Sequence, residues 1–391
     1  MQKQENSCHI RCFVGSYGDA DLLSSVGGIS PAAYYYQKRL VETIEPEECT
    51  WLLPLPLFSE RIAKQIIVNT NKKNNSNWFP RNVIFRLSFL CLPPLIQQLV
   101  HQYLAPMPGP KVVWVYNSEF NNIIFIIRLF FARKKIFIIL ADTSPSGIHS
   151  FFTRFGLFLC CSYISLSSVG LRIFPCKQPF HFPGIAERTP PELNFIDIST
   201  KLAHQLPHNL LNLLSDTTKP IVMLSGSLGF STGIQLLADT APFFPEVIFL
   251  MTGKPYCITH QELLNCIGSH HNIYYLGLLP KFDYQILLKK SCLGLSLRMP
   301  LNEHNFNFPS KILEYLSYGL PVISSLDYGL PSPPVFVCNS YDKVSLSHQI
   351  KSVLKLERHD LSVEATKLSS CYSSANFLAS VRSLESRDIY P

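Results

Sequence analysis

The sequence predicts an α/β protein made of two doubly wound domains. Its 391 residues exceed what one ordinary core holds, since most domains contain roughly 100–200 residues. Two series of short apolar runs, rich in β-branched and aromatic residues, alternate with helix-length segments. This alternation is typical of a parallel sheet covered on both faces. A stretch interrupted by prolines separates the two series and marks the division between the domains.

The first domain is expected over residues 1–182. A strand over residues 9–15 precedes the Gly27-Gly28 turn and a helix over residues 32–44, which is how a nucleotide-binding-like half-domain begins. The runs KVVWVY (111–116) and IFIILA (136–141) predict two further strands. Because they lack Cβ atoms, Gly27 and Gly28 would allow the backbone to approach a phosphate or an acceptor, and a plain turn is the alternative.

The linker is expected over residues 183–217 and the second domain over residues 218–370. Five strands are predicted there, each followed by a helix or a turn: 221–226, 247–253, 272–277, 293–298 and 321–325. The predicted helices cover residues 232–241, 260–267, 284–290 and 310–318. Residues 371–391 are expected to form a C-terminal helix that packs back on the first domain.

Composition excludes several classes of protein. With 47% hydrophobic and only 16% charged residues, the chain is neither disordered nor fibrous. The twelve cysteines show no C-x-x-C pair and no zinc-like spacing to histidine, and they are interpreted as reduced thiols. Asp19 and Asp21 spell a D-x-D motif, but acidic loop residues are usually solvated. We expect no metal, no cofactor and no nucleic-acid partner.

Basic residues are interleaved with apolar ones between Arg81 and Arg154, in a chain whose net charge is +7. This pattern predicts peripheral contact with an anionic membrane, and core helices with solvated basic edges are the alternative. The most apolar segment, 123–140, is broken by Arg128 and by the basic run 133–135, so no spanning helix is expected. The N-terminus lacks the apolar region of a secretory signal, so a cytoplasmic location is expected.

The most informative segment is 302–325, NEHNFNFPSKILEYLSYGLPVISS. Pro309 and Ser310 begin a helix that Gly319 ends. The free amides of the helix start, its dipole and Lys311 together predict an anion site. Glu314 lies about one turn further, so a diphosphate at the helix start and sugar hydroxyls at Glu314 would describe a bound nucleotide-sugar. The alternative is a capped amphipathic helix in which Glu314 only pairs with Lys311.

The segment FPSKILEYLSYGLPVIS resembles the donor-site signature of the retaining glycosyltransferases of family 4. Upstream, SGSLGFSTGIQLL (225–237), FLMTG (249–253) and NIYYLGLLP (272–280) are similar to further family segments and follow in the same order. The resemblance covers residues 220–326 well and the first half only in outline. It implies a GT-B fold, with two Rossmann-like domains, an active site in the cleft between them, and transfer with retention of configuration.

The resemblance also implies the residues of the donor site. They are Gly226, Ser227, Thr232, Gly253, Arg298, Phe308, Pro309, Ser310, Lys311 and Glu314. The chain departs from the family at two places: the first glutamate of the E-x7-E pair is replaced by Phe306, and the usual Arg and Lys of the first loop are replaced by Ser227 and Thr232. Lys311 and Arg298 are expected to supply the missing charge. The chain's P-S-K-x-x-E-Y motif, at residues 309–315, resembles that of a branch of the family that acts in surface-polysaccharide assembly.

Asp142 and Glu314 are the candidate catalytic residues. Asp142 follows the strand expected over residues 136–141, where a carboxylate could orient the acceptor hydroxyl or accept its proton. A helix-capping role is the alternative. His149 is interpreted as a polar loop residue.

The sequence therefore predicts a glycosyltransferase that moves a sugar from a nucleotide-sugar, held by the second domain, to a lipid-linked or saccharide acceptor, held by the first. Two alternatives stay open. One is a GT-B nucleotide-sugar epimerase, which would require further acid and base residues. The other is a non-catalytic nucleotide-sugar-binding or partner protein, which the departures at Phe306 and in the first loop would suit. A dehydrogenase is disfavoured because no G-x-G-x-x-G follows the first strand.

Overall fold

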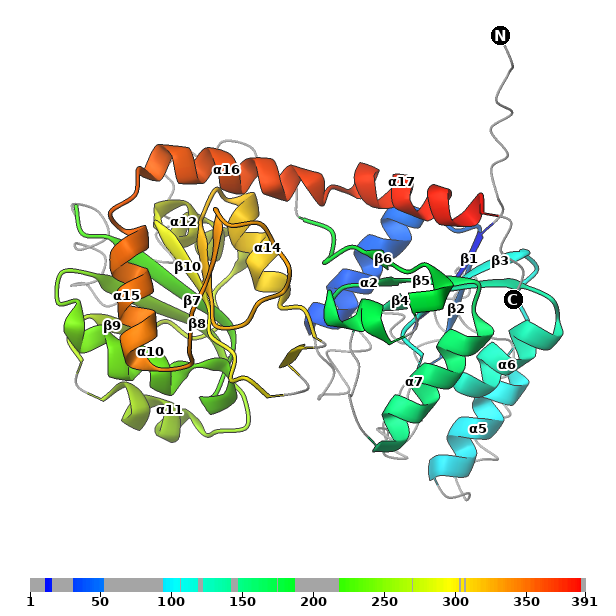
Figure 1. The fold of residues 1–391 in the computed structure, drawn as a ribbon. Coiled ribbons are helices and arrows are strands. Elements are labelled where there is room, and N and C mark those ends of the chain that lie inside the picture. The colour runs from blue at the N-terminus through cyan, green and yellow to red at the C-terminus, as the bar shows by residue number, and fades with distance from the viewer. Residues whose placement is uncertain are drawn as a thin grey trace, which may run out of the picture. The chain divides into compact units, whose positions relative to one another are not determined.

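The computed structural model describes residues 11–15, 31–52, 94–105, 107–118, 122–141, 147–173, 175–186, 218–268, 270–301, 304–305 and 307–387. The chain divides into two compact units, one containing residues 1–185 and 374–391 and the other residues 186–373. Each unit has its own six-stranded parallel sheet with helices on both faces (Figure 1). The predicted pair of doubly wound α/β domains is confirmed. Most of the expected linker, from residue 187 onward, lies outside the described residues.

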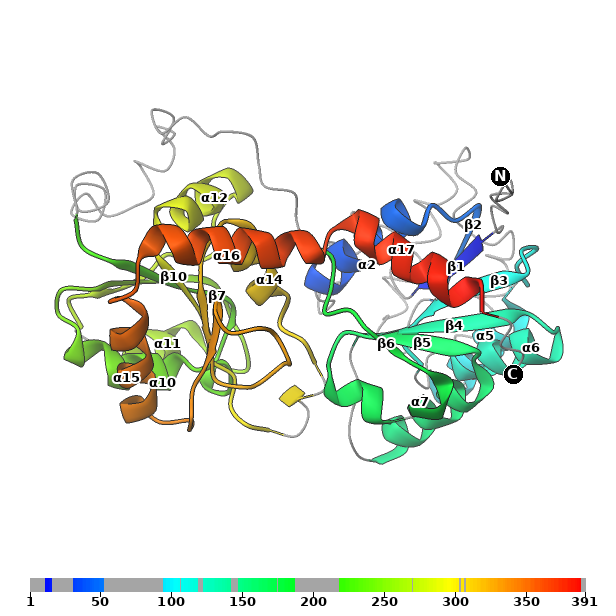
Figure 2. The same cartoon turned by 45° about the horizontal axis from the view of Figure 1, so that its top comes forward.

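The first sheet has the strand order β2-β1-β3-β4-β5-β6. Its strands are β1 (Arg11–Gly15), β2 (Glu48–Trp51), β3 (Val112–Tyr116), β4 (Lys135–Leu140), β5 (Ser162–Ser165) and β6 (Phe180–His181). The helices of this unit are α2 (Pro31–Ile44), α5 (Pro94–Leu104), α6 (Ile123–Phe131), α7 (Gly147–Leu159) and α17 (Ser374–Glu385), with 3₁₀ turns at Val169–Arg172 and Pro175–Lys177. Helices α5, α6 and α7 form one layer, and α2 and α17 pack together on the other face (Figures 1 and 2).

The second sheet has the strand order β12-β11-β10-β7-β8-β9. Its strands are β7 (Ile221–Leu228), β8 (Ile248–Pro255), β9 (Ile273–Tyr275), β10 (Leu293–Ser296), β11 (Val322–Ser324) and β12 (Val335–Val337). The helices are α10 (Ile234–Thr240), α11 (His260–Ile267), α12 (Lys281–Lys290), α14 (Ser310–Ser317), α15 (Lys343–Val353) and α16 (Arg358–Cys371), with 3₁₀ turns at Phe230–Thr232 and Ala241–Phe243. The prediction of five strands was wrong by one, because β12 was missed.

The C-terminal helix α17 is held in the first unit by a buried ion pair. The guanidinium of Arg11 on β1 donates to both carboxylate oxygens of Glu385, at 2.7 and 2.8 Å. The indole of Trp114 on β3 donates to the same carboxylate at 2.8 Å. Apolar side chains on the same helix, Phe377 and Val381, are also fully buried. The last turn of α17 is therefore held on the neighbouring inner strands β1 and β3 by three charge-assisted hydrogen bonds.

We expect Glu385→Ala to lower the free energy of unfolding of the first unit by about 3–5 kcal/mol, because the buried charge of Arg11 would lose the carboxylate that faces it. All three tryptophans of the chain, Trp51, Trp78 and Trp114, belong to this unit. Urea unfolding followed by tryptophan fluorescence therefore reports on it selectively.

Glu42→Ala is the matched control. Glu42 pairs with Lys38 on α2 at 3.9 Å, and both side chains are more than half exposed, so its loss should cost at most about 1 kcal/mol. Equal unfolding midpoints for the two variants would contradict the role given to Glu385.

Candidate functional site

The order of the second sheet indicates where a ligand would bind. Strand β7 is flanked by β8 on one side and by β10 on the other, so the chain winds outward in opposite directions from this point. In doubly wound sheets, ligands bind outside the carboxyl ends of the strands at such a switch point. The ends of β7 and β10, and the helices that begin there, are therefore the candidate site.

The loop after β7 is closed on itself by Thr232. Its hydroxyl accepts a hydrogen bond from the Gly229 amide at 2.7 Å and donates one to the Gly229 carbonyl at 3.0 Å. The Ser231 carbonyl accepts a bond from the amide of Met299, beyond β10, at 2.9 Å. The Thr232 hydroxyl thus shapes the loop, and the loop is tied to the segment that carries Arg298.

Three glycines allow close backbone approach at this edge. A Cβ on Gly253 would lie 1.8 Å from the carbonyl oxygen of Gly226 on the neighbouring strand, and one on Gly233 would lie 2.2 Å from the Cβ of Leu297. All three glycines have positive φ angles, of +122° at Gly226, +89° at Gly233 and +136° at Gly253. A side chain at Gly253 would push β7 and β8 apart, and one at Gly233 would push the loop after β7 away from the end of β10. At Gly226 the positive φ angle alone favours glycine, since a Cβ there would meet only the Lys311 side chain, at 3.8 Å.

Ser227 and Lys254 occupy opposite positions on β7 and β8. Both residues are exposed. Sequence analysis identified Ser227 as the place of a missing cation but did not identify Lys254, which the register of the two strands brings beside it. The local signal that could have identified Lys254 is its position directly after Gly253, near the end of a predicted strand.

Helix α14 runs back from the carboxyl end of β10, so its N-terminus lies at the same edge of the sheet. It begins at Ser310 after Pro309 in the N-cap position, and no side chain caps it. Ser310 is exposed, whereas Ile312, Leu313, Tyr315 and Leu316 are buried. The start of α14 accordingly presents amide groups, and the dipole of the helix favours an anion there.

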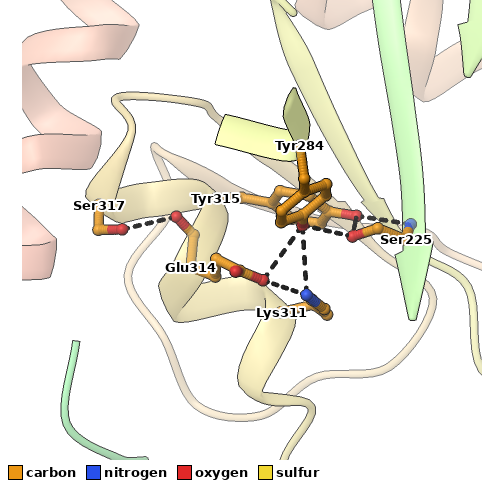
Figure 3. Close-up of polar contacts among 6 residues, drawn as sticks. All are labelled: Ser225, Tyr284, Lys311, Glu314, Tyr315 and Ser317. Atoms are coloured by element: carbon orange, nitrogen blue, oxygen red, sulfur yellow. Dashed lines mark hydrogen bonds and ion pairs between the residues drawn. The ribbon is translucent and has the colours of Figure 1, made fainter. Parts of the chain in front are cut away.

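A polar network joins α14 to α12 and β7 (Figure 3). Lys311 forms an ion pair with Glu314, and its ammonium donates to the Tyr284 hydroxyl at 3.3 Å. Tyr284 donates to the Glu314 carboxylate at 3.1 Å. The ammonium also lies 4.6 Å from the centre of the Tyr284 ring, a cation–π distance. Lys311 and Glu314 thus do meet, and Tyr284, which sequence analysis missed, contacts both.

The network continues inward through Ser225 of β7. The Ser225 hydroxyl lies 2.8 Å from the Tyr284 hydroxyl and 2.8 Å from the Tyr315 hydroxyl, and its amide donates to Tyr315 at 2.9 Å. Each hydroxyl carries one proton. Because Tyr284 donates to Glu314, the remaining protons are fixed in one direction: Ser225 donates to Tyr284, and Tyr315 donates to Ser225.

Burial keeps both phenols protonated. Burial raises the pKa of Tyr284 well above its ordinary value, and the negative charge of Glu314 raises it further. Burial likewise raises the pKa of Tyr315. The side chains of Lys311 and Glu314, by contrast, are 33% and 21% exposed. The buried phenols therefore act as fixed hydrogen-bond partners, and the two charged groups above them remain accessible to a ligand.

Arg298 fixes the segment that leads into α14. Its guanidinium donates to the Asn307 carbonyl at 2.9 Å, and its own carbonyl accepts a bond from the Ser325 hydroxyl at 2.6 Å. Phe308 is buried and packs edge-to-face on Tyr328, with ring centres 5.4 Å apart. Burial raises the pKa of Tyr328 to about 12, while the charge of Arg298 opposes that rise. Arg298 and Phe308 therefore position the start of α14.

Several predicted residues lie outside the described part of the chain. These are Gly27, Gly28, Asp142 and Phe306, together with Asp19 and Asp21. His149, which was expected in a loop, belongs instead to helix α7, and its side chain is not described. Among the described residues, no group of three or more His, Cys, Asp or Glu side chains could hold a metal ion. The nine cysteines whose side chains the structure describes are free thiols.

A cavity of about 410 Å³ lies at the opposite, amino edge of the second sheet. Its lining includes Ile221, Cys292 and Pro321, which stand at or before the starts of β7, β10 and β11. Arg358 also lines it and donates to the Ser291 carbonyl at the end of α12, at 2.8 Å. Because ligands of such sheets bind at carboxyl ends, this cavity is separate from the candidate site.

No protein-family description and no curated protein sequence matches this chain. Solved structures match it over nearly its whole length. Sucrose-phosphate synthase from Thermosynechococcus elongatus has a TM-score of 0.63 and 11% identity, covering 96% of this chain and 98% of that one. HepE of Anabaena, in complex with UDP-glucose, has a TM-score of 0.59 and 13% identity, covering 97% and 100%.

UDP-GlcNAc 2-epimerase from Neisseria meningitidis, bound to UDP-GlcNAc, has a TM-score of 0.52 and 11% identity, covering 96% of this chain and 99% of that one. At such identities the likeness shows the fold alone. The chain has the two-domain GT-B fold that its sequence predicted.

Two alanine substitutions test the close approach of β7 and β8. We expect Gly253→Ala to lower the free energy of unfolding by at least about 1–3 kcal/mol more than Gly268→Ala, because overpacking adds to the strain of a positive φ angle. Gly268 also has a positive φ angle, but a Cβ there would meet only the Asn265 carbonyl, at 3.9 Å. Urea unfolding followed by far-UV circular dichroism makes the comparison. Equal losses would show that β7 and β8 can separate freely.

Proposed function

We propose that the chain is a glycosyltransferase whose second unit binds a nucleotide-sugar and whose first unit holds a lipid-linked or saccharide acceptor. The observation that carries this proposal is the start of α14, where uncapped helical amides, Lys311 and Glu314 meet at the carboxyl edge beside the switch point. The GT-B fold supports it as well, since structures with this fold include proteins solved with UDP-glucose and UDP-GlcNAc.

The charges of Lys311 and Glu314 decide which part of the donor each residue is proposed to bind. A diphosphate carries about two negative charges, and a helix N-terminus offers only about half a positive charge, so at least one side-chain cation should take part. We assign that part to Lys311, with Ser310 and Lys311 contributing amides. Glu314 then binds hydroxyls of the donor. Ser227, Gly226 and Gly253 line the approach to the phosphates.

The ion pair of Lys311 and Glu314 is not an obstacle to this assignment. A partly exposed pair is worth only about 0–1 kcal/mol, so a diphosphate can displace Glu314 from the ammonium at small cost. Tyr284 contacts both members and would hold each in place while they exchange partners.

For the reaction we propose transfer with retention, in which the acceptor attacks on the face from which the diphosphate leaves. The start of α14 would stabilise the charge that develops on the leaving group, so this scheme uses no protein nucleophile and no metal. Asp142 is proposed to orient the acceptor hydroxyl. A role in surface-polysaccharide assembly, at the cytoplasmic side of a membrane, belongs to the same proposal.

An epimerase is the second candidate, because UDP-GlcNAc 2-epimerase shares the fold. Thermal shifts measured with UDP-, GDP-, ADP- and CMP-sugars would identify the donor, since a ligand that binds the native state raises its melting temperature. Mass spectrometry and NMR of the products then separate the activities. Transfer of the sugar to an acceptor supports the transferase, and an inverted ring carbon in the recovered donor or in released sugar supports the epimerase. Hydrolysis of the donor without acceptor supports an enzyme of either kind, and binding without turnover supports a non-catalytic protein.

Lys311→Ala tests the phosphate assignment. We expect it to lower kcat/KM at least about tenfold more than Arg298→Ala, equivalent to about 1.4 kcal/mol of transition-state stabilisation. The reason is that the Arg298 guanidinium holds the Asn307 carbonyl, whereas the Lys311 ammonium is partly exposed at the helix start.

Lys367→Ala is the control, because Lys367 forms an ion pair of the same spacing with Glu364 on α16 and should leave kcat/KM unchanged. Normal turnover by Lys311→Ala together with an inactive Arg298→Ala would mean that the phosphates lie at the end of β10 instead.

A further inference from the structure

The outer face of α7 in the first unit carries a stripe of exposed aromatic side chains. Phe151, Phe155 and Phe158 are 62%, 37% and 60% exposed, and their spacing places them on one side of the helix. The rings of Phe151 and Phe155 stack, with centres 6.2 Å apart and planes 5° apart. Single exposed apolar residues are ordinary, but a contiguous aromatic stripe marks an interaction surface.

The opposite face of α7 is buried in the unit. Thr153 and Leu157 are buried, and Gly156 lies so close to Ser118 that a Cβ there would be 1.7 Å from its hydroxyl. The helix therefore cannot turn its phenylalanines inward without losing this packing. The aromatic stripe faces away from the core of its own unit.

Cations flank the stripe. Arg154 is exposed between the phenylalanines, and Arg172 is exposed in the 3₁₀ turn after β5. The Lys177 ammonium lies 5.9 Å from the centre of the Phe158 ring. Between residues 94 and 186 the sequence has eight Lys and Arg but only two Asp and Glu, and neither acid, Glu119 or Asp142, is among the described residues. The surroundings of the stripe are thus basic and apolar together.

The neighbouring helices also carry exposed apolar side chains. Helices α5, α6 and α7 lie side by side over one face of the first sheet (Figures 1 and 2). Further exposed apolar side chains are Tyr103 on α5 and Phe131 at the end of α6, where Arg133 is also exposed. No helix among the described residues is long and apolar enough to cross a membrane.

We propose that the aromatic face of α7, with Arg154, Arg172 and Lys177, docks the protein on the surface of a membrane that contains anionic lipid. Phenylalanine rings enter the boundary between headgroups and acyl chains, and the cations bind the headgroups. A second copy fits this face less well, because a symmetric interface would set the basic patch against itself. The inference does not depend on the transferase activity proposed above.

Co-sedimentation of the full chain with vesicles tests the proposal. We expect binding to vesicles of phosphatidylcholine mixed with phosphatidylglycerol at low salt, release at high salt through screening, and little binding to phosphatidylcholine alone. Combined Phe151→Ala, Phe155→Ala and Phe158→Ala should weaken binding at least about tenfold, since buried aromatic area is lost. Arg154→Glu with Lys177→Glu should weaken binding and reduce its dependence on salt.

Phe243→Ala is the matched control. Phe243 belongs to the second unit, is 58% exposed, and has the Lys343 ammonium 5.9 Å from its ring centre, so it reproduces the pair formed by Phe158 and Lys177. Its substitution should leave vesicle binding unchanged. Thermal shifts with nucleotide-sugars should be the same in the triple variant and the unaltered protein, which separates failure of this inference from failure of the proposed function.

Three results would overturn the inference. One is equal binding to vesicles with and without anionic lipid, and another is undiminished binding by the triple variant. The third is a dimer, detected by light scattering, that the triple variant loses while vesicle binding is absent. That last result would assign the aromatic face to a second copy of the chain.

Discussion

The second unit depends on one constraint, the close approach of backbone at the carboxyl ends of β7, β8 and β10. Gly253 meets the Gly226 carbonyl where any Cβ would collide, and Gly233 meets Leu297 in the same way. Because these strand ends converge, the loop after β7, the segment after β10 and the start of α14 meet at one edge of the sheet. The amides and cations proposed to receive a diphosphate come from these converging segments.

Beneath that edge, a chain of hydroxyl groups sets the orientation of the charged residues. Tyr315 packs so tightly on Gly294 that a Cβ there would lie 2.4 Å from the ring, which leaves the phenol no freedom to move. It donates to Ser225, Ser225 donates to Tyr284, and Tyr284 supports both charged residues of α14. An unpaired buried hydroxyl costs about 1–3 kcal/mol, so this network gives Glu314 and Lys311 a defined position even without a ligand.

The sequence predicted those features that depend on local signals. Helix α11 was predicted at its observed bounds, and the structure shows a local cause for them: Thr259 and Glu262 form a capping box at its start. Strand β12 was missed because its three residues follow a proline-rich stretch, and pairing with β11 rather than propensity makes it a strand. Helix α12 was predicted to begin three residues too late, at Tyr284. In the structure it begins at Lys281, so Tyr284 lies one turn inside the helix.

Contacts between distant parts of the chain left no local signal. Arg11 and Glu385 are 374 positions apart, and Glu385 lies in a polar stretch that resembles a solvated helix end. The facing of Lys254 and Ser227 likewise follows from strand register alone. Lys311 and Glu314 could be predicted as neighbours because helical spacing brings them together, but the spacing could not show that a phenol from α12 joins them.

Hydrogen–deuterium exchange measured with and without a nucleoside diphosphate tests the central claim most directly, because amides that bind phosphate are protected. We expect UDP or another nucleotide of the panel to slow exchange in two segments, the end of β7 with the loop after it at residues 226–233 and the start of α14 at residues 308–312. The amino edge, around Cys292 and Pro321, should not change. Protection confined to the amino edge, or none at saturating nucleotide, would contradict a phosphate site at the start of α14.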